Sequence, residues 1–438
     1  MAQVSSNDVV NLFKKVYGSL HDLQPEDFPL QKDIPFSQKE KVGESFSEAM
    51  VLTAETGWTL GGSTADAFDL NPAIAGTVKQ TLVNAYTSIL ASVVPWGVLA
   101  RSAGGGEKAF FDGTKHVVRN NLKSHGKLLE ILRLYGQATD LLGKVSYATA
   151  TYRGTAFTNG TGTLNGVAFT NGVNVAAKAL LLAPGSFASG IWVGTEGAVI
   201  NQVNALGAVV ASGKLVTVDA DYGILYVDFV PVAATSATSH RVCFQGQESL
   251  KDMIGIQPIL AASGNLFGIS TSAYSLWKGN VVDCGNQKFS FDFLQAGVAG
   301  AVNKGGLDGN LKIYLNPRSW GKLITTEAGK RVYDSSYKSS EMSNGAESIT
   351  FYHQAGKAEI VAHRMVKEGD AFALSLEDWT RSGSSEISFT VPGIDKEIIF
   401  PLENSAAHAF RSFSDQYMFC HAPARSIYFK NINDESAT

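Results

Sequence analysis

A run of apolar or small residues at three- and four-residue steps extends across residues 107–142. This period matches one face of an α-helix, so the run predicts one long amphipathic helix. The predicted apolar face consists of Phe110, Thr114, Val118, Leu122, His125, Leu129, Leu132, Tyr135, Thr139 and Leu142. The charged residues on the opposite face, which we expect to contact water, are Lys115, Arg119, Lys123, Lys127, Glu130 and Arg133.

This predicted helix is unusually long. At about 1.5 Å per residue it spans roughly 50 Å, and Gly143 is its expected C-terminal stop. Thr114, His125 and Thr139 interrupt the apolar face, so a coiled coil is not expected. Two interpretations remain open on the pattern alone: a core helix of an ordinary α+β enzyme, or the structural backbone of a flat, extended subunit.

Residues 1–36 are predicted to form an arm without a hydrophobic core of its own. A short amphipathic helix is expected at residues 6–20, and Pro25, Pro29 and Pro35 are expected to keep the following chain extended. Such a segment becomes ordered only where it lies on another part of a structure.

Residues 37–101 show the alternation of apolar and polar positions that is typical of β-strands. One strand is predicted at 41–53 and a second at 78–94, with a glycine-rich tip between them. A lone hairpin is marginally stable in water, so we expect it to pack on a neighbouring chain. A place in an internal sheet of the same domain is the alternative.

Residues 151–245 differ in composition from the rest of the chain, because they carry almost no charge and many Gly, Ala, Thr and Val residues. The sequence Ala-Phe-Thr-Asn-Gly occurs at 156–160 and again at 168–172, and Asn-Gly is a strong hairpin signal. These features predict a separable β-rich module, so replacing residues 153–241 by a short linker is expected to leave the remaining chain folded.

From residue 246 onward helical and strand patterns alternate. The predicted helices are 248–260, 289–303 and 319–328. The predicted strands are 310–316, 349–352, 357–362, 371–376, 386–391, 398–402, 407–413, 418–421 and 426–429.

Composition narrows the functional classes. Charged residues make up 17% of the 438 residues, below the roughly 25% of an average globular protein, which favours extensive contacts between subunits. A net charge of −4 and a pI near 6.1, without a basic run, argue against a dedicated nucleic-acid binder.

The three cysteines, Cys243, Cys284 and Cys420, lie far apart and form no CxxC pair, so neither a disulfide framework nor a zinc site is indicated. No signal peptide and no apolar run of the length of a membrane helix is found, so synthesis in a cytoplasm is expected.

Every candidate for chemistry lacks the partners that its reaction needs. Ser335 and Lys338 match an SxxK pattern, but no KTG motif follows. The glycines at 160–162 and the stretch 207–214 lack the spacing of a nucleotide-binding loop. His116 and His125 are expected on helix faces too different for one site. We interpret Cys420 and His421 as a core residue and its neighbour, and the pairs Asp219 and Asp221, and Glu377 and Asp378, as solvated. The sequence therefore predicts no catalytic residue, no metal site and no cofactor.

The order of the predicted elements, an arm, a long hairpin, a long helix, a mixed α/β region and returning strands, resembles the major capsid protein of tailed bacteriophages, the Hong Kong ninety-seven type. Local similarity extends over residues 134–145, 267–280, 315–363 and 367–375. The resemblance covers most of residues 39–429, and residues 151–245 fit it least.

The resemblance implies an α+β fold with peripheral and axial domains, a long spine helix, an extended loop and a β-rich insertion. The implied ranges are 1–36 for the arm, 37–101 for the extended loop, 102–150 and 386–438 for the peripheral domain, 151–245 for the insertion and 246–385 for the axial domain. Residues 53–77 contain no lysine and Lys41 and Lys79 lie at the base of the loop, so a lysine crosslink is not expected.

The function that the resemblance implies is a shell subunit that assembles as hexamers and pentamers into an icosahedral capsid around double-stranded DNA. Implied partners are other copies of the chain, scaffolding, portal and decoration proteins, and packaged DNA that is contacted non-specifically, with no membrane. The implied location is the virion, after synthesis in the host cytoplasm. An encapsulin-type compartment shell, which resembles the same fold, is the alternative.

Overall fold

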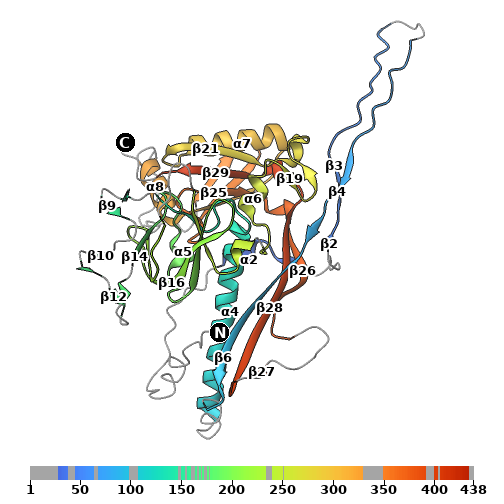
Figure 1. Cartoon of the computed structure of the whole chain (residues 1–438). Helices are drawn as coiled ribbons and strands as arrows, with labels where there is room; N and C mark the ends of the chain where they lie inside the picture. Colours follow the sequence, from blue (N-terminus) through green and yellow to red (C-terminus); the bar gives the residue numbers. More distant parts are fainter. Residues whose placement is uncertain are drawn as a thin grey trace, which may run out of the picture.

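The computed structural model describes residues 28–37, 45–63, 68–97, 107–146, 149–152, 155–158, 163–164, 167–168, 170–171, 175–176, 178–232, 239–249, 251–328, 349–390, 399–402 and 405–433. The predicted helix at 6–20, the SxxK residues Ser335 and Lys338, and the glycines at 160–162 lie outside these ranges. Figure 1 shows a body of sheets and helices, a long helix that leaves the body beside two long strands, and an arm that projects away from it.

The long helix α4 (Glu107–Tyr135) confirms the main prediction, but it ends seven residues earlier than expected. A Cβ atom at Gly136 would lie 2.0 Å from the carbonyl oxygen of Met253, so only glycine fits at this end. Gln137 and Leu141 then adopt positive φ angles in the turns that follow. Gly136, and not the predicted Gly143, is therefore the residue at which the helix stops.

The prediction for the charged face of α4 is wrong in its C-terminal half. Glu130 and Arg133 are fully buried, whereas Leu122 on the predicted apolar face is 38% exposed. The helix has neighbours on more than one side, because it contacts β6 and β28 as well as α6. Charged side chains tolerate such burial only when they are paired, and these two pair with each other.

The strands beside α4 form one five-stranded sheet, here called the long sheet. Its strands are β1 (Phe36–Ser37), β26 (Trp379–Ser388), β28 (Ala407–Cys420), β27 (Ile399–Pro401) and β6 (Tyr86–Pro95). The predicted strands at 407–413 and 418–421 are one continuous strand, β28. Strand β6 pairs antiparallel with β28 along its whole length, so this part of the predicted hairpin belongs to an internal sheet of the chain.

The arm is the rest of that hairpin. Two short antiparallel ladders hold it together, and its strands are β2 (Ser45–Phe46), β3 (Ala49–Val51), β4 (Val78–Gln80) and β5 (Val83–Asn84). At its root Phe46 stacks on Tyr417 with ring centroids 5.5 Å apart, and packs edge-on against Phe419. The root is therefore fixed to the long sheet, while the part beyond Val51 and Val78 extends away from the body (Figure 1).

A six-stranded mixed sheet, here called the mixed sheet, forms the upper body in Figure 1. In spatial order its strands are β21 (Asn280–Gln287), β29 (Ile427–Ile432), β25 (Ala371–Leu374), β22 (Leu311–Leu315), β24 (Gly356–Ala362) and β23 (Ile349–His353). Helix α7 (Phe291–Gly305) packs Leu294 and Val298 into the same hydrophobic cluster as Ile427 and Phe429. Helix α8 (Pro317–Ala328) follows β22. Most predicted elements of this region are confirmed.

Two differences occur in this region. The predicted helix at 248–260 is reduced to the short η1 (Gln247–Ser249) and α6 (Ile256–Leu260). Gly255 interrupts it, because a Cβ there would lie 2.7 Å from the carbonyl oxygen of Leu132. Strand β21 and the small hairpin of β19 (Asn265–Leu266) and β20 (Ile269–Ser270) were not predicted.

A third sheet, here called the insertion sheet, contains most of the predicted β-rich module. Its strands are β14 (Lys178–Leu181), β17 (Ile224–Val227), β16 (Val209–Asp219), β15 (Val199–Val203), β18 (Arg241–Phe244) and β7 (Gly143–Lys144). Trp192 of α5 (Ser189–Trp192), Leu215 and Leu225 belong to the same hydrophobic cluster as Leu134 and Tyr135 of the long helix. Side chains of residues 153–241 therefore belong to the common core, so the expected removal of this range would expose part of that core.

The repeat residues lie among three two-stranded hairpins. These pair β8 (Thr149–Tyr152) with β9 (Thr155–Thr158), β10 (Thr163–Leu164) with β11 (Val167–Ala168), and β12 (Thr170–Asn171) with β13 (Val175–Ala176). Leu164 pairs with Val167 in the second hairpin, and Asn171 pairs with Val175 in the third. Asn159, Gly160 and Gly172 of the repeat lie outside the described residues, so the hairpin prediction for its Asn-Gly pairs stays a prediction.

Candidate functional site

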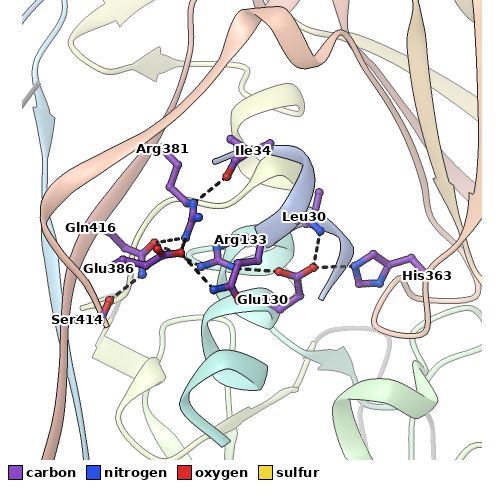
Figure 2. Close-up of polar contacts among 10 residues, drawn as sticks. Leu30, Ile34, Glu130, Arg133, His363, Arg381, Glu386, Ser414 and Gln416 are labelled. Atoms are coloured by element: carbon purple, nitrogen blue, oxygen red, sulfur yellow. Dashed lines mark hydrogen bonds and ion pairs between the residues drawn. The ribbon is translucent and has the colours of Figure 1, made fainter. Parts of the chain in front are cut away.

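Charged and polar side chains, all of them buried except the half-buried Glu386, gather where the long helix meets the long sheet and the mixed sheet, and we call them the polar cluster (Figure 2). Its members are Glu130, Arg133, His363, Arg381, Glu386, Ser414 and Gln416. Burial of so many polar groups is costly unless each finds a partner, so their contacts decide what the cluster does.

Glu130 is the centre of the polar cluster. Its Oε2 atom lies 2.8 Å from Nη1 of Arg133, and its Oε1 atom accepts a 2.7 Å hydrogen bond from the backbone N–H of Leu30. Nε2 of His363 donates to the same Oε1 at 3.1 Å, because Nδ1 of that ring accepts from the N–H of Met365. Burial raises the pKa of Glu130, but His363, Arg133 and Leu30 outweigh it and hold the pKa below its ordinary value.

Two arginines share the other side of the cluster. Burial and the nearby charge of Arg381 lower the pKa of Arg133 to about 10, which leaves it protonated at neutral pH. Nη1 of Arg381 forms an ion pair of 2.7 Å with Oε1 of Glu386. Oε1 of Gln416 accepts from both guanidinium groups, at 3.3 and 3.5 Å. Two cations thus face two carboxylates, so the cluster is neutral as a whole.

The polar contact continues along the helix toward its N-terminal half. His125 is fully buried between two serines, with Nε2 at 2.8 Å from Oγ of Ser88 and Nδ1 at 2.8 Å from Oγ of Ser412. One turn earlier, Asn121 donates to Oγ of Ser92 at 2.8 Å. The helix and the long sheet therefore meet through hydrogen bonds over several turns.

His125 gives this contact a pH dependence. Burial, together with the charge of Arg133, lowers its pKa from 6.5 to about 4, so the folded chain holds the neutral ring. Its contribution to stability is present above pH 6.5 and is lost as the pH falls from 6.5 toward 4. We expect the free energy of unfolding to drop by about 2 kcal/mol more between pH 7 and 4.5 in the native chain than in His125→Gln. Urea denaturation at the two pH values measures this difference.

His408→Gln is the matched control, because His408 lies near the start of β28 and outside these contacts. It should retain the full pH dependence of the native chain. An identical pH dependence of His125→Gln and the native chain would contradict the assignment.

The arm presents the opposite chemistry, since it carries large apolar side chains in contact with water. Exposed fractions reach 77% for Trp58 and 93% for Leu60. The other exposed apolar residues of the arm are Val51, Phe68, Leu70, Ile74 and Val78. Its described residues 51–63 and 68–77 contain acidic but no basic side chains. This many large apolar side chains exposed on one projecting arm indicate a contact with another molecule.

Where the rejected chemical motifs fall on described residues, the structure brings none of them together into a site. Gly207 lies in the turn before β16, and Asp219 accepts hydrogen bonds from the N–H groups of Asp221 and Tyr222 in the next turn. Burial raises the pKa of the Cys420 thiol well above its ordinary value. Its neighbour His421 pairs with Glu48 at the arm root, at 3.1 Å.

Glu377 and Asp378 lie in the 3-10 helix η4 (Leu376–Asp378) between two sheets. Asp378 there contacts Arg425 at 3.4 Å. The described residues contain no group of three or more potential metal ligands. Among the described helices, none is long and apolar enough to cross a membrane.

The polar cluster was not predicted from the sequence. Glu130 and Arg133 were assigned to water because they are charged, yet their spacing of three residues is that of an ion pair on a helix. The distant partners Arg381 and Gln416 carry no comparable signal, because only the fold brings them to the helix.

Comparison with known proteins identifies the fold. No protein-family model matches the chain, and no curated protein matches its sequence. The capsid of cyanophage A-1(L) has a TM-score of 0.52 and 10% sequence identity, with 96% of this chain and 97% of that chain covered.

Two further solved structures are less similar. The capsid of a native GTA particle has a TM-score of 0.44 at 8% identity, with 96% of this chain and 93% of that chain covered. An encapsulin from Synechococcus elongatus has a TM-score of 0.41 at 6% identity, with 97% and 95% covered. The fold assignment depends on the cyanophage capsid, and the chain has the fold of phage capsid proteins, the Hong Kong ninety-seven type.

Proposed function

We propose that the chain is the major subunit of a phage capsid, assembling as hexamers and pentamers into an icosahedral shell around double-stranded DNA. The observation that carries the proposal is the likeness to the cyanophage A-1(L) capsid over 96% of this chain and 97% of that chain. The likeness extends over nearly the whole of both chains and is not confined to one domain.

The exposed arm supports a role in assembly. Its apolar side chains contact water in a single subunit, and burying one such side chain contributes about 1.5–3 kcal/mol. A neighbouring copy in a shell is the partner we propose for them. In this proposal residues 102–150 and 386–438 form the peripheral domain, residues 246–385 form the axial domain, and residues 151–245 form the insertion.

We further propose that the protein is structural and not catalytic, that it works in the virion after synthesis in a host cytoplasm, and that scaffolding, portal and decoration proteins are its other partners. Packaged DNA would be contacted non-specifically.

Expression of the chain and electron microscopy of the material separated by size exclusion test the proposal. We expect hexamers, pentamers or closed shells, and we expect particles from infected cells to contain nuclease-protected DNA. A stable monomer that forms no particles would contradict the proposal. Closed shells that enclose protein cargo and no DNA would indicate an encapsulin-type compartment instead.

A further inference from the structure

Residues 28–37, here called the strap, cross the long helix and contact both the mixed sheet and the long sheet. The strap contains α2 (Pro29–Asp33) and β1, and its side chains Leu30 and Ile34 are 0% and 1% exposed. Phe28 packs on the helix at Gly126, where the closest ring atom lies 3.2 Å from the position of a Cβ. The strap is therefore part of the hydrophobic core and not a loosely attached end.

On the side of the mixed sheet, a single residue of the strap makes the polar contacts. Oδ1 of Asp33 accepts from Nζ of Lys312 at 2.8 Å, and Oδ2 accepts from the hydroxyl of Tyr314 at 2.6 Å. Burial and the contact with Asp33 raise the pKa of Tyr314, so its hydroxyl remains a donor. Both partners lie on β22, next to the centre of the mixed sheet.

On the side of the long sheet, the contacts are made mainly by the strap backbone. Nε of Arg381 donates to the carbonyl oxygen of Ile34 at 3.0 Å (Figure 2), and Oγ of Ser382 donates to that of Ser37 at 2.8 Å. Phe36 and Ser37 pair in parallel with β26. On the helix itself, the N–H of Leu30 is bound by Glu130.

The strap adds to the contacts that already join the two sheets, which are a shared hydrophobic core, the polar cluster and a hydrogen bond of 3.1 Å from Nε1 of Trp379 to Oγ of Ser426. Among the described strands, none of the mixed sheet pairs with one of the long sheet. The chain passes between the sheets at one junction, from β25 through η4 to β26 and from β28 through η5 (Pro423–Arg425) to β29. Leu374, the last residue of β25, pairs with Lys312, so the strap crosses the corner at this junction.

We propose that the strap is a brace that sets the angle between the mixed sheet and the long sheet. The contacts of Asp33 hold one side of the corner and those of Ile34 and Ser37 hold the other. Detaching either side allows the sheets to rotate about the junction while each sheet remains folded. If the chain is a shell subunit, as proposed above, this angle determines the curvature that the subunit fits.

The test measures the angle on unassembled subunits by pulsed electron paramagnetic resonance. Spin labels are placed at Ala91→Cys on the long sheet and Gln287→Cys on the mixed sheet, both at exposed positions. The three native cysteines are buried and do not compete for the label. Asp33→Ala is expected to broaden the distribution of label distances about twofold and to speed amide exchange in the strap on the order of tenfold.

Asp69→Ala is the matched control, since it makes the same change at an exposed position of the arm. The double variant Lys312→Met and Tyr314→Phe removes the same contacts from the other side, keeps the side-chain volumes, and should reproduce the broadening. A distribution in both variants as narrow as that of Asp69→Ala would overturn the proposal. Failure of the native chain to form shells would count against the proposed function alone, because the distances are measured before assembly.

Discussion

Replacing Glu130 with alanine is expected to lower the free energy of unfolding by about 3–5 kcal/mol, which is typical when one member of a buried ion pair is removed. The change leaves Arg133 without its 2.8 Å partner and leaves the N–H of Leu30 and Nε2 of His363 without an acceptor. All of this occurs at positions that are fully or almost fully buried, where water cannot replace the lost contacts. Urea denaturation of unassembled subunits, followed by circular dichroism, measures the loss.

Glu55→Ala provides the control, because Glu55 is exposed on the arm and its loss should change stability by less than about 0.5 kcal/mol. A second variant distinguishes the cost of leaving the Arg133 guanidinium unpaired from the cost of the cavity that the smaller alanine side chain leaves. If the cost comes from the unpaired guanidinium, adding Arg133→Met to Glu130→Ala should recover part of the lost stability. Equal stabilities of Glu130→Ala and Glu55→Ala would show that the polar cluster contributes little.

Period and alternation predicted the elements that bury one apolar face. The long helix and most strands of the mixed sheet were found this way, because their packing depends on local sequence. Strand β28 was predicted as two pieces, since Ser414, Asp415 and Gln416 interrupt its apolar pattern. Ser414 and Gln416 point into the polar cluster, so the interruption marks the polar contact and not a break in the strand.

Two sequence features, Pro29 and the low charge of residues 151–245, were interpreted differently from what the structure shows. Pro29 was expected to keep the chain extended, yet it begins α2, because its fixed φ suits the first turn of a helix, where no backbone N–H is needed. The low charge of residues 151–245 was interpreted as a sign of separation. For residues 178–245 it reflects burial instead, because side chains such as Leu180, Trp192 and Leu225 are in the common core.

The contacts that the sequence did not predict are those between residues far apart in the chain. Arg381 lies 248 residues from Arg133 and the strap contacts residues of both sheets, so no local pattern contains this information. The fold itself was predicted from a resemblance in the order of the elements and not from any local pattern. The likeness to the cyanophage capsid then supported that prediction.

Shortening the arm is expected to abolish closed shells while leaving the subunit folded. The N–H of Leu52 donates to the carbonyl oxygen of Thr77 at 2.8 Å, so these two residues can flank a two-residue turn. Replacing residues 53–76 by Asn-Gly therefore keeps both ladders of the arm and its root on Tyr417. It removes Trp58, Leu60 and the other exposed apolar side chains of the tip, none of which belongs to the buried core.

Circular dichroism of the shortened chain should match that of the native chain, and microscopy should show free capsomers or small oligomers in place of shells.

A point variant tests whether the apolar side chains of the arm or its length matter for assembly. Leu60→Ser should weaken assembly. Leu206→Ser is its control, because Leu206 has the same 93% exposure but lies in a turn of the insertion sheet. Each arm tip that docks buries side chains worth about 1.5–3 kcal/mol apiece, and a shell repeats the contact in every subunit. Closed shells of unchanged size and thermal stability from the shortened chain would show that the tip does not hold subunits together, and an unfolded chain would show that the arm stabilises its own subunit.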